Sequence, residues 1–204
     1  MKKNIACLCG TNIAIEYEEN IDIDSNPNIL KEIFSGAFMS YKCDFCGKNH
    51  KPEFKILIEW KAKNLKMEVF PELDRGEFYR NKKENTDTET IISFPEMADR
   101  LAVINDDLEP AVIETLKSYL LEKAAENYPD RDVNAWYHCK NPDGIEFHLS
   151  GIKYGEVAVM KIPANLYEKI LDDYEKHPKN GIFPSLRIRS YLSVQNLLRN
   201  DALK

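Results

Sequence analysis

Two short cysteine motifs decide how this sequence folds: Cys7-Leu8-Cys9-Gly10 and Cys43-Asp44-Phe45-Cys46-Gly47, with 33 residues between the two pairs. Each pair is followed at once by glycine, which adopts positive φ without steric cost. Two thiolates close in sequence reach one ion only where the chain turns sharply, and such a glycine lets the backbone turn away. Two turns of this kind supply the four sulfurs that structural zinc prefers. We therefore predict one structural zinc per chain, on Cys7, Cys9, Cys43 and Cys46.

Other uses of these cysteines stay open. His50 lies four residues after Cys46, so Cys9, Cys43, Cys46 and His50 would also make a reasonable ligand set. A thiol redox role is a further alternative, although Cys-x-x-Cys redox pairs usually begin a helix and a strand is expected after Cys46. Catalytic zinc is disfavoured, because four thiolates leave no position for water.

Composition and cysteine number restrict the class of protein. The chain has 204 residues, a formal charge of −6 and 43% hydrophobic residues, enough for one large domain or two small ones. No apolar run approaches the roughly 18 residues that span a bilayer, and no signal-peptide core follows the N-terminus. We expect a cytoplasmic protein without a membrane segment. The chain has five cysteines, and this odd number argues against a disulfide framework. The fifth cysteine, Cys139, lies outside the two motifs and is predicted to be a packing residue.

Strand patterns surround the cysteine motifs. Apolar residues alternate over 12–17, 53–60 and 65–69, the last two forming a hairpin. Between the motifs, Asn26-Pro27 begins a short helix that Gly36 ends, and residues 38–42 are predicted as the strand that leads to the second motif.

A polar stretch divides the chain. Residues 81–90 contain no apolar side chain and are predicted as a linker or surface loop between a domain at 1–80 and a C-terminal α/β region at 91–204. In the second region, Asp106-Asp107 is predicted to cap a helix that runs to Tyr128. The other predicted elements there are helices at 95–103, from 163 and near 191–199, and strands at 135–139, 145–149 and 156–162.

These features together resemble the CpXC family of bacterial and archaeal proteins over about residues 5–126. The resemblance rests on the two cysteine pairs with their glycines, the helical insert between them, the hairpin that ends at Phe70-Pro71, and Asn105-Asp106-Asp107-Leu108. The family is named for a Cys-Pro-x-Cys motif that occurs twice, and here Leu8 and Asp44 follow the first cysteines. The resemblance implies a zinc-ribbon-like domain, no established activity, and metal ligands at Cys7, Cys9, Cys43 and Cys46.

Other residue patterns give no catalytic motif. Asp106-Asp107 has a capping role available, and there is no phosphate-binding glycine loop, Ser-His-Asp signature or zincin motif. His138, Cys139 and His148 lie on a predicted hairpin. Because neighbouring strand residues point to opposite faces, His138 and Cys139 should not join one site, and strand packing is the favoured interpretation. We expect a protein that is not an enzyme.

Charge suggests an alternative function. Residues 42–83 hold 11 basic and 7 acidic residues, with aromatic residues interspersed, so single-stranded nucleic-acid binding is possible. Phe54 and Trp60, however, share an alternating face with Ile56 and Ile58, which favours a core position. The sequence thus predicts an α+β protein: a zinc-ribbon-like antiparallel β domain with a helical insert, then a helix and a C-terminal α/β segment. Its predicted role is to bind a protein or peptide through a zinc-stabilised module.

Overall fold

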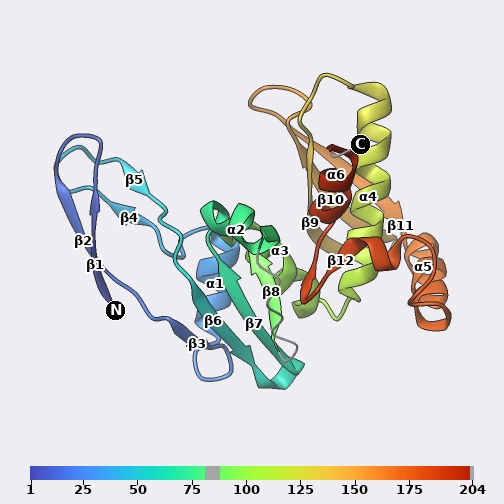
Figure 1. The fold of residues 1–204 in the computed structure, drawn as a ribbon, viewed down its shortest axis with the longest axis horizontal. Coiled ribbons are helices and arrows are strands. Elements are labelled where there is room, and N and C mark those ends of the chain that lie inside the picture. Colours follow the sequence, from blue (N-terminus) through green and yellow to red (C-terminus); the bar gives the residue numbers. More distant parts are fainter. Residues whose placement is uncertain (81–87, 203–204) are drawn as a thin grey trace. The chain divides into compact units, whose positions relative to one another are not determined.

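The computed structural model describes residues 1–80 and 88–202, which divide into two compact units, Met1–Ala98 and Asp99–Lys204 (Figure 1). The division falls within helix α3 (Phe94–Asn105). Each unit combines helices with β-sheet, which confirms the α+β class. Positions 81–87 of the predicted linker lie outside the described residues, and its end belongs to strand β8 (Glu89–Ile92).

Two small hairpins of unit 1 carry the cysteine motifs. Strand β1 (Lys2–Ala6) pairs antiparallel with β2 (Asn12–Glu16), and β4 (Tyr41–Lys42) pairs antiparallel with β5 (Asn49–His50). The turn of each hairpin holds one cysteine pair, and Figure 1 shows both turns at the same end of the unit. Two hairpins that meet at cysteine-bearing turns form the zinc-ribbon-like segment.

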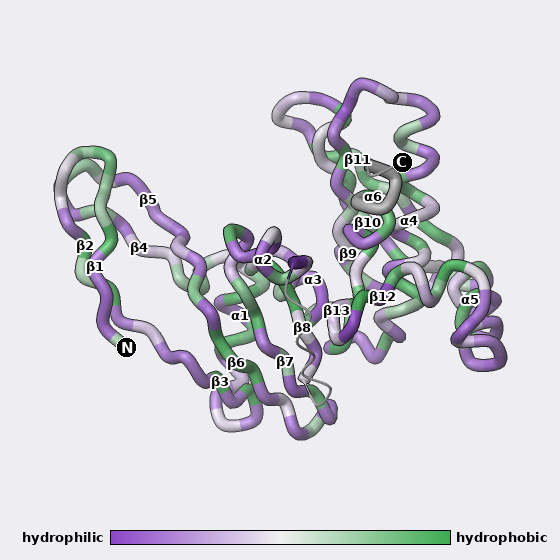
Figure 2. The backbone as a smooth tube through the Cα atoms, viewed as in Figure 1, coloured by the Kyte–Doolittle hydropathy of each residue, from purple (hydrophilic) through white to green (hydrophobic). Residues whose placement is uncertain are grey.

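The rest of unit 1 is built on a sheet with the strand order β8-β7-β6-β3. Strands β6 (Ile56–Trp60) and β7 (Leu65–Phe70) form the predicted antiparallel hairpin, while β3 (Asn20–Asp22) and β8 join it in parallel. Figure 2 shows hydrophobic stretches along β6 and β7. The predicted alternation is confirmed, since the buried residues of these two strands are Ile56, Ile58, Trp60, Met67 and Val69.

Backbone conformation sets the limits of the insert between the motifs. Helix α1 (Asn28–Ser35) follows Pro27 and ends at Gly36, which has φ of 72° as the sequence predicts. The predicted strand at 38–42 shrinks to the two residues of β4, because Met39 has φ of 51° and cannot continue an extended chain. After the sheet, a 3₁₀ turn (Glu72–Asp74) and α2 (Arg75–Arg80) complete the described part of this region.

Unit 2 contains a three-stranded antiparallel sheet in the order β11-β10-β9. Its strands are β9 (Asn134–Asn141), β10 (Gly144–Ser150) and β11 (Val157–Pro163). Helices α4 (Pro110–Asn127) and α5 (Ala164–Lys176) pack on this sheet. The core joins apolar residues of α4 to the inward residues of the strands, among them Val112, Leu116, Leu120, Ala135, Tyr137, Ile145, Phe147 and Leu149.

The chain then adds a 3₁₀ turn (Phe183–Leu186), the short hairpin of β12 (Arg187–Ile188) and β13 (Tyr191–Leu192), and α6 (Gln195–Ala202). The last helix starts later than predicted because Tyr191 and Leu192 form β13. Among the residues that the structure describes, no helix is long and apolar enough to cross a membrane.

The start of α4 differs from the sequence-based prediction. The N-cap is Glu109, whose side chain accepts a hydrogen bond from the Ala111 backbone N–H at 3.1 Å, and Pro110 is the first helical residue. Asp107 has φ of 54° in the turn before the cap. Asp106 accepts a hydrogen bond from the Tyr137 hydroxyl. The two aspartates therefore form the turn between α3 and α4 and do not cap α4.

A buried ionic network joins the end of α3 to α4 in unit 2. Lys117 Nζ donates to Asp99 and, at 2.8 Å, to Glu114, and all three side chains are almost fully buried. Asp99 also accepts from the Tyr137 backbone N–H at 2.6 Å. Arg100 lies 3.7 Å from Glu114. Two acids and two bases thus compensate one another, which makes burial of four charged groups tolerable.

Candidate metal centre

The two cysteine turns share one pattern of backbone hydrogen bonds. In the first turn, Cys7 N–H donates to Thr11 O and Gly10 N–H donates to Cys7 O, at 2.8 and 2.9 Å. In the second turn, Cys43 N–H donates to Lys48 O and Gly47 N–H donates to Cys43 O, both at 2.8 Å. The first turn is shorter by one residue and still closes in the same way. Both glycines have positive φ, 90° and 73°, as the sequence predicts.

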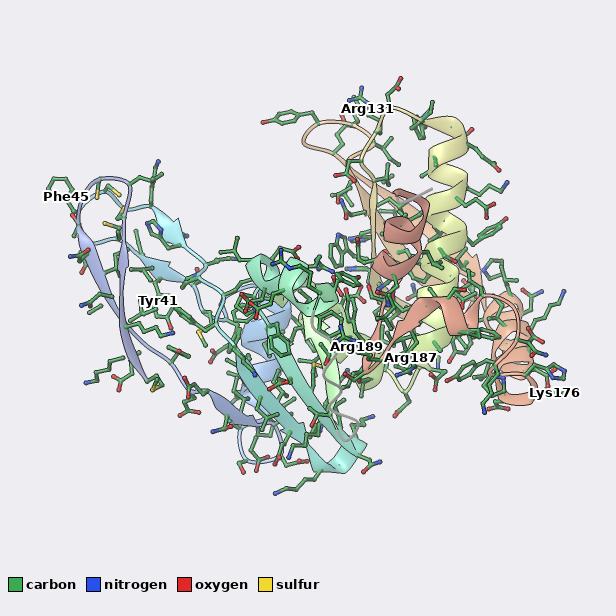
Figure 3. All side chains as sticks on the ribbon, viewed as in Figure 1. Tyr41, Phe45, Arg131, Lys176, Arg187 and Arg189 are labelled. Carbon is green, nitrogen blue, oxygen red and sulfur yellow. The ribbon has the colours of Figure 1, made fainter. Side chains whose placement is uncertain are left out.

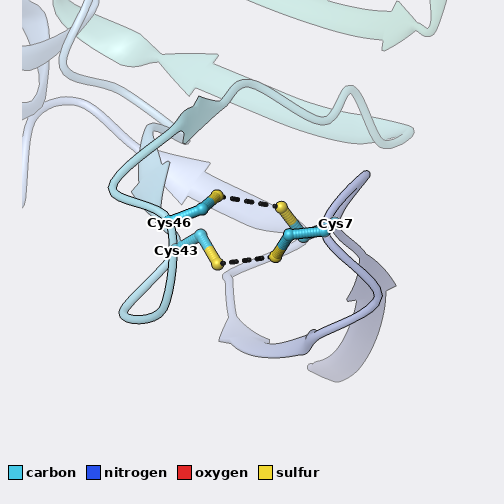
Figure 4. Close-up of side chains that lie close together, drawn as sticks. Cys7, Cys43 and Cys46 are labelled. Carbon is cyan, nitrogen blue, oxygen red and sulfur yellow. Dashed lines mark hydrogen bonds between the residues drawn. The ribbon is translucent and has the colours of Figure 1, made fainter.

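These turns bring all four predicted cysteines together (Figure 4). Cys7 Sγ lies 3.5 Å from Cys46 Sγ, and Cys9 Sγ lies 3.7 Å from Cys43 Sγ. All four sulfurs lie within 4.8 Å of one another. A tetrahedral ion with a metal–sulfur bond of about 2.3 Å separates its sulfurs by about 3.8 Å. The spacing of the four sulfurs therefore suits a metal ion held by four thiolates.

The two cysteines of each pair differ in exposure. The first cysteines, Cys7 and Cys43, are buried, whereas Cys9 and Cys46 are exposed. His50, on β5, points its Nε2 at Cys7 Sγ from 3.2 Å. It lies beside the sulfur cluster as a hydrogen-bonding neighbour of one sulfur, while the group of residues that could share one ion consists of the four cysteines. Such a neighbour orients and stabilises a thiolate.

Thr11 prepares one thiol for ionisation. Its hydroxyl lies 3.4 Å from Cys9 Sγ, and this contact, followed by hydrogen bonding to the Thr11 backbone, lowers the pKa of Cys9 to about 6. Cys7 behaves in the opposite way. The Cys9 backbone N–H lowers its pKa, but burial and the thiols of Cys9, Cys46 and Cys43 together raise it to about 12. Cys9 therefore ionises more readily than Cys7, and a metal ion that binds both must displace the proton of Cys7.

Apolar side chains occupy the tips of both turns. Leu8 stands between the cysteines of the first turn and is 89% exposed, and Phe45 stands in the second turn and is 79% exposed. Figure 3 shows Phe45 projecting outward from its loop. The sulfurs lie behind these tips and hold the two turns together, so the position of both apolar residues depends on the cluster.

Residues 5–117 match the model of the family described as CpXC protein. The chain belongs to the CpXC family. The match includes all four cysteines of the cluster and ends within α4, nine residues before the limit predicted from the sequence.

A relative matches this CpXC chain over most of its length. An uncharacterised protein of Treponema pallidum (strain Nichols) is 28% identical over 214 residues, which cover 95% of this chain and 97% of the relative. No solved structure matches the chain. The family proline is absent from both turns, where Leu8 and Asp44 stand instead. The backbone hydrogen bonds described above close each turn without it.

Outside the cysteine cluster, the structure brings together His138, Glu146 and His148, a group that holds both histidines of the predicted hairpin and does not include Cys139. The rings of His138 and His148 stack at 3.8 Å between centroids, and Glu146 lies beside both. Cys139 is half-buried and its Sγ accepts a hydrogen bond from Asn141 at 3.4 Å. Strand alternation places these three side chains on one face of the hairpin, so the spacing of His138, Glu146 and His148 around the two-residue turn is the sequence pattern that could have indicated the cluster.

Proposed function

We propose that this CpXC protein is a non-catalytic interaction module in which one structural zinc holds a binding surface for a protein or peptide in the cytoplasm. The observation that carries the proposal is the cluster of four sulfurs at tetrahedral spacing, at the joined turns of two hairpins. Four thiolates fill the coordination shell of zinc, which favours a structural role over a catalytic one. The cytoplasm keeps such thiols reduced.

The hairpins themselves explain why a metal would be needed. Strands β4 and β5 have two residues each, and isolated two-stranded hairpins are marginally stable in water. A structural zinc contributes about 10–16 kcal/mol to the folding of comparable small sites. We therefore propose that the ion fixes the two turns relative to each other.

The binding surface consists of Leu8 and Phe45. Large apolar side chains that are almost fully exposed at loop tips are costly to leave in water and are typical anchors of protein interfaces. The nucleic-acid alternative has weaker support. Acids lie beside the basic side chains that would contact phosphate and reduce the local positive charge: Asp22 is 3.8 Å from Lys61, Glu59 is 3.0 Å from Lys66 and Glu68 is 2.7 Å from Lys55.

Site-specific photocrosslinking tests the proposal. A photoreactive phenylalanine analogue replaces Phe45 in the full chain inside cells, and the same analogue replaces Tyr154, which is fully exposed in unit 2, as the matched control. We expect a discrete protein adduct from position 45, lost when Cys43→Ser is added, and no such adduct from position 154. Equal adducts at both positions, or an adduct that persists with Cys43→Ser, would refute the surface.

The same protein distinguishes the alternatives. Retention on single-stranded oligonucleotide at low salt, lost on substituting Lys61, Lys63 and Lys66, would favour nucleic-acid binding. Reversible formation of a Cys43–Cys46 disulfide under mild oxidant, in place of metal-protected thiols, would favour a redox role.

A further inference from the structure

One face of the sheet in unit 2 carries a second group of metal-binding side chains. Tyr137 pairs with Phe147 and Cys139 pairs with Glu146, so His138 is an extra residue in β9. Trp136 pairs with His148, so ordinary alternation places His138, two residues after Trp136, on the same face of the sheet as Glu146 and His148. This face is opposite the one that α4 and α5 cover. The β-bulge formed by the extra residue changes the local direction of β9 at His138, whose ring stacks on that of His148.

The three side chains of this group converge. Glu146 Oε1 lies 3.8 Å from His138 Nε2 and 3.4 Å from His148 Nε2, and one ligand atom from each of the three residues lies within 4.8 Å of the others. A tetrahedral ion with ligand bonds of about 2.1 Å separates its ligand atoms by about 3.4 Å. The observed spacing is thus close to that of three ligands on one ion.

We propose that His138, Glu146 and His148 form a second metal site, which binds a divalent transition ion such as zinc independently of the four cysteines. Two imidazoles and one carboxylate are ligands that suit Zn²⁺, Ni²⁺, Cu²⁺ or Fe²⁺ and disfavour Mg²⁺ and Ca²⁺, which prefer all-oxygen surroundings. The proposal goes beyond the interaction module proposed above and does not rest on it.

Neighbouring charges leave this group free for a cation. Lys161 is paired with Glu146 across β10 and β11, but its ammonium contacts Asp143 at 3.0 Å. The carboxylate of Glu146 therefore faces the two imidazoles. The stacked rings lie within 16° of parallel, so ligation would rotate them out of the stack. There is room for that rotation, because the His138 and His148 side chains are 50% and 33% exposed.

The site differs in kind from the cysteine cluster. Three protein ligands leave at least one coordination position open to water or to another ligand, whereas four thiolates leave none. The second site would also be weaker and exchangeable, since it lies on an open face of the sheet. It would therefore load and unload metal under conditions in which the cysteine site stays filled.

The test uses the full chain with its metal content washed by a chelator of moderate strength. Zinc binding is measured by calorimetry for the wild type, His148→Gln and Glu146→Gln, with His177→Gln as the matched control from the same unit. We expect one exchangeable zinc per wild-type chain, with affinity lowered at least about 100-fold in the two site variants, since loss of a second-shell partner alone costs about 10- to 100-fold. The control should bind as the wild type does.

A second measurement identifies the ligands directly. Substoichiometric Ni²⁺ should broaden the imidazole NMR resonances of His138 and His148 and leave those of His50 and His177 sharp. The proposal is overturned if the wild type shows no exchangeable site, if His148→Gln binds zinc as tightly as the wild type, or if His177→Gln causes the same loss. Because Trp136 pairs with His148, circular dichroism is the check of folding, and an unchanged spectrum should accompany each variant.

Discussion

Replacing Lys117 with methionine should destabilise unit 2 strongly. The side chains of Lys117, Asp99 and Glu114 are 5%, 5% and 6% exposed, and Lys117 contacts both acids. Without the ammonium, two buried carboxylates share the single cation of Arg100, which lies 3.7 Å from Glu114. Removing one partner of a buried ion pair costs about 3–5 kcal/mol. That is a large part of the roughly 5–15 kcal/mol that stabilises a typical domain.

The pKa of Glu114 agrees with this argument. Burial opposes ionisation of its carboxyl group, but the charges of Lys117 and Arg100 overcome burial and hold the pKa below its usual value. Such a group stabilises the folded state above its unfolded pKa, and the contribution is lost as the pH falls through the folded value. Lys117→Met removes the larger of the two attractions, so the loss of stability should be evident at neutral pH.

The assay is urea unfolding of the full chain followed by tryptophan fluorescence. The chain has two tryptophans, so a Trp60→Phe background leaves only Trp136, on β9, as the reporter of unit 2. Lys123→Met is the matched control, because Lys123 forms an exposed pair with Glu126 on the same helix and should lose less than about 0.5 kcal/mol. Adding Asp99→Asn to Lys117→Met should restore about half or more of the loss, because Glu114 and Arg100 then remain as a compensated pair. A cost for Lys117→Met equal to that of Lys123→Met would refute the reasoning.

Three further outcomes follow from the cysteine turns. Zinc affinity should decrease as the pH is lowered, and more steeply below about pH 6. Cys7, with a pKa near 12, is protonated at neutral pH, so zinc must displace its proton, whereas Cys9, with a pKa near 6, becomes protonated only under acid conditions. Calorimetry at several pH values checks this dependence. Gly10→Ala should weaken zinc binding about tenfold through backbone strain of about 1–2 kcal/mol at φ of 90°, while Gly76→Ala, at a glycine without positive φ, should have no effect in the same titration. Thr11→Val should raise the pKa of Cys9 in metal-free protein, seen as slower alkylation near pH 7, and an unchanged rate would contradict the role given to the Thr11 hydroxyl.

The cysteine site could be predicted because its chemistry is local. Each turn is specified by a cysteine pair and the glycine after it, and the hydrogen bonds that close the turn join residues at most five apart. The hairpin of β6 and β7 could also be predicted, because one face of each strand is buried and apolar residues therefore alternate with polar ones along the sequence. The first turn has one residue fewer than the second and still forms the same two backbone hydrogen bonds, so the same prediction applied to both.

Long-range contacts explain what the sequence could not predict. Glu114 and Lys117 look like a solvated helix face, and only Asp99 and Arg100, brought in from α3, make their burial tolerable. Strand β8 begins inside a stretch without apolar residues, because pairing with β7 selects its conformation. The bulge at His138 depends on how β9 meets β10, and no residue in either strand marks it beforehand.

The most direct test of the central claim is the metal content of the full chain, purified without added metal and washed with a chelator of moderate strength. The His148→Gln variant serves as the background, so that only the cysteine cluster retains an ion. The account predicts one zinc per chain, lost together with the folded state of the two hairpins when Cys43→Ser is added. A fully folded chain that carries no metal would contradict it.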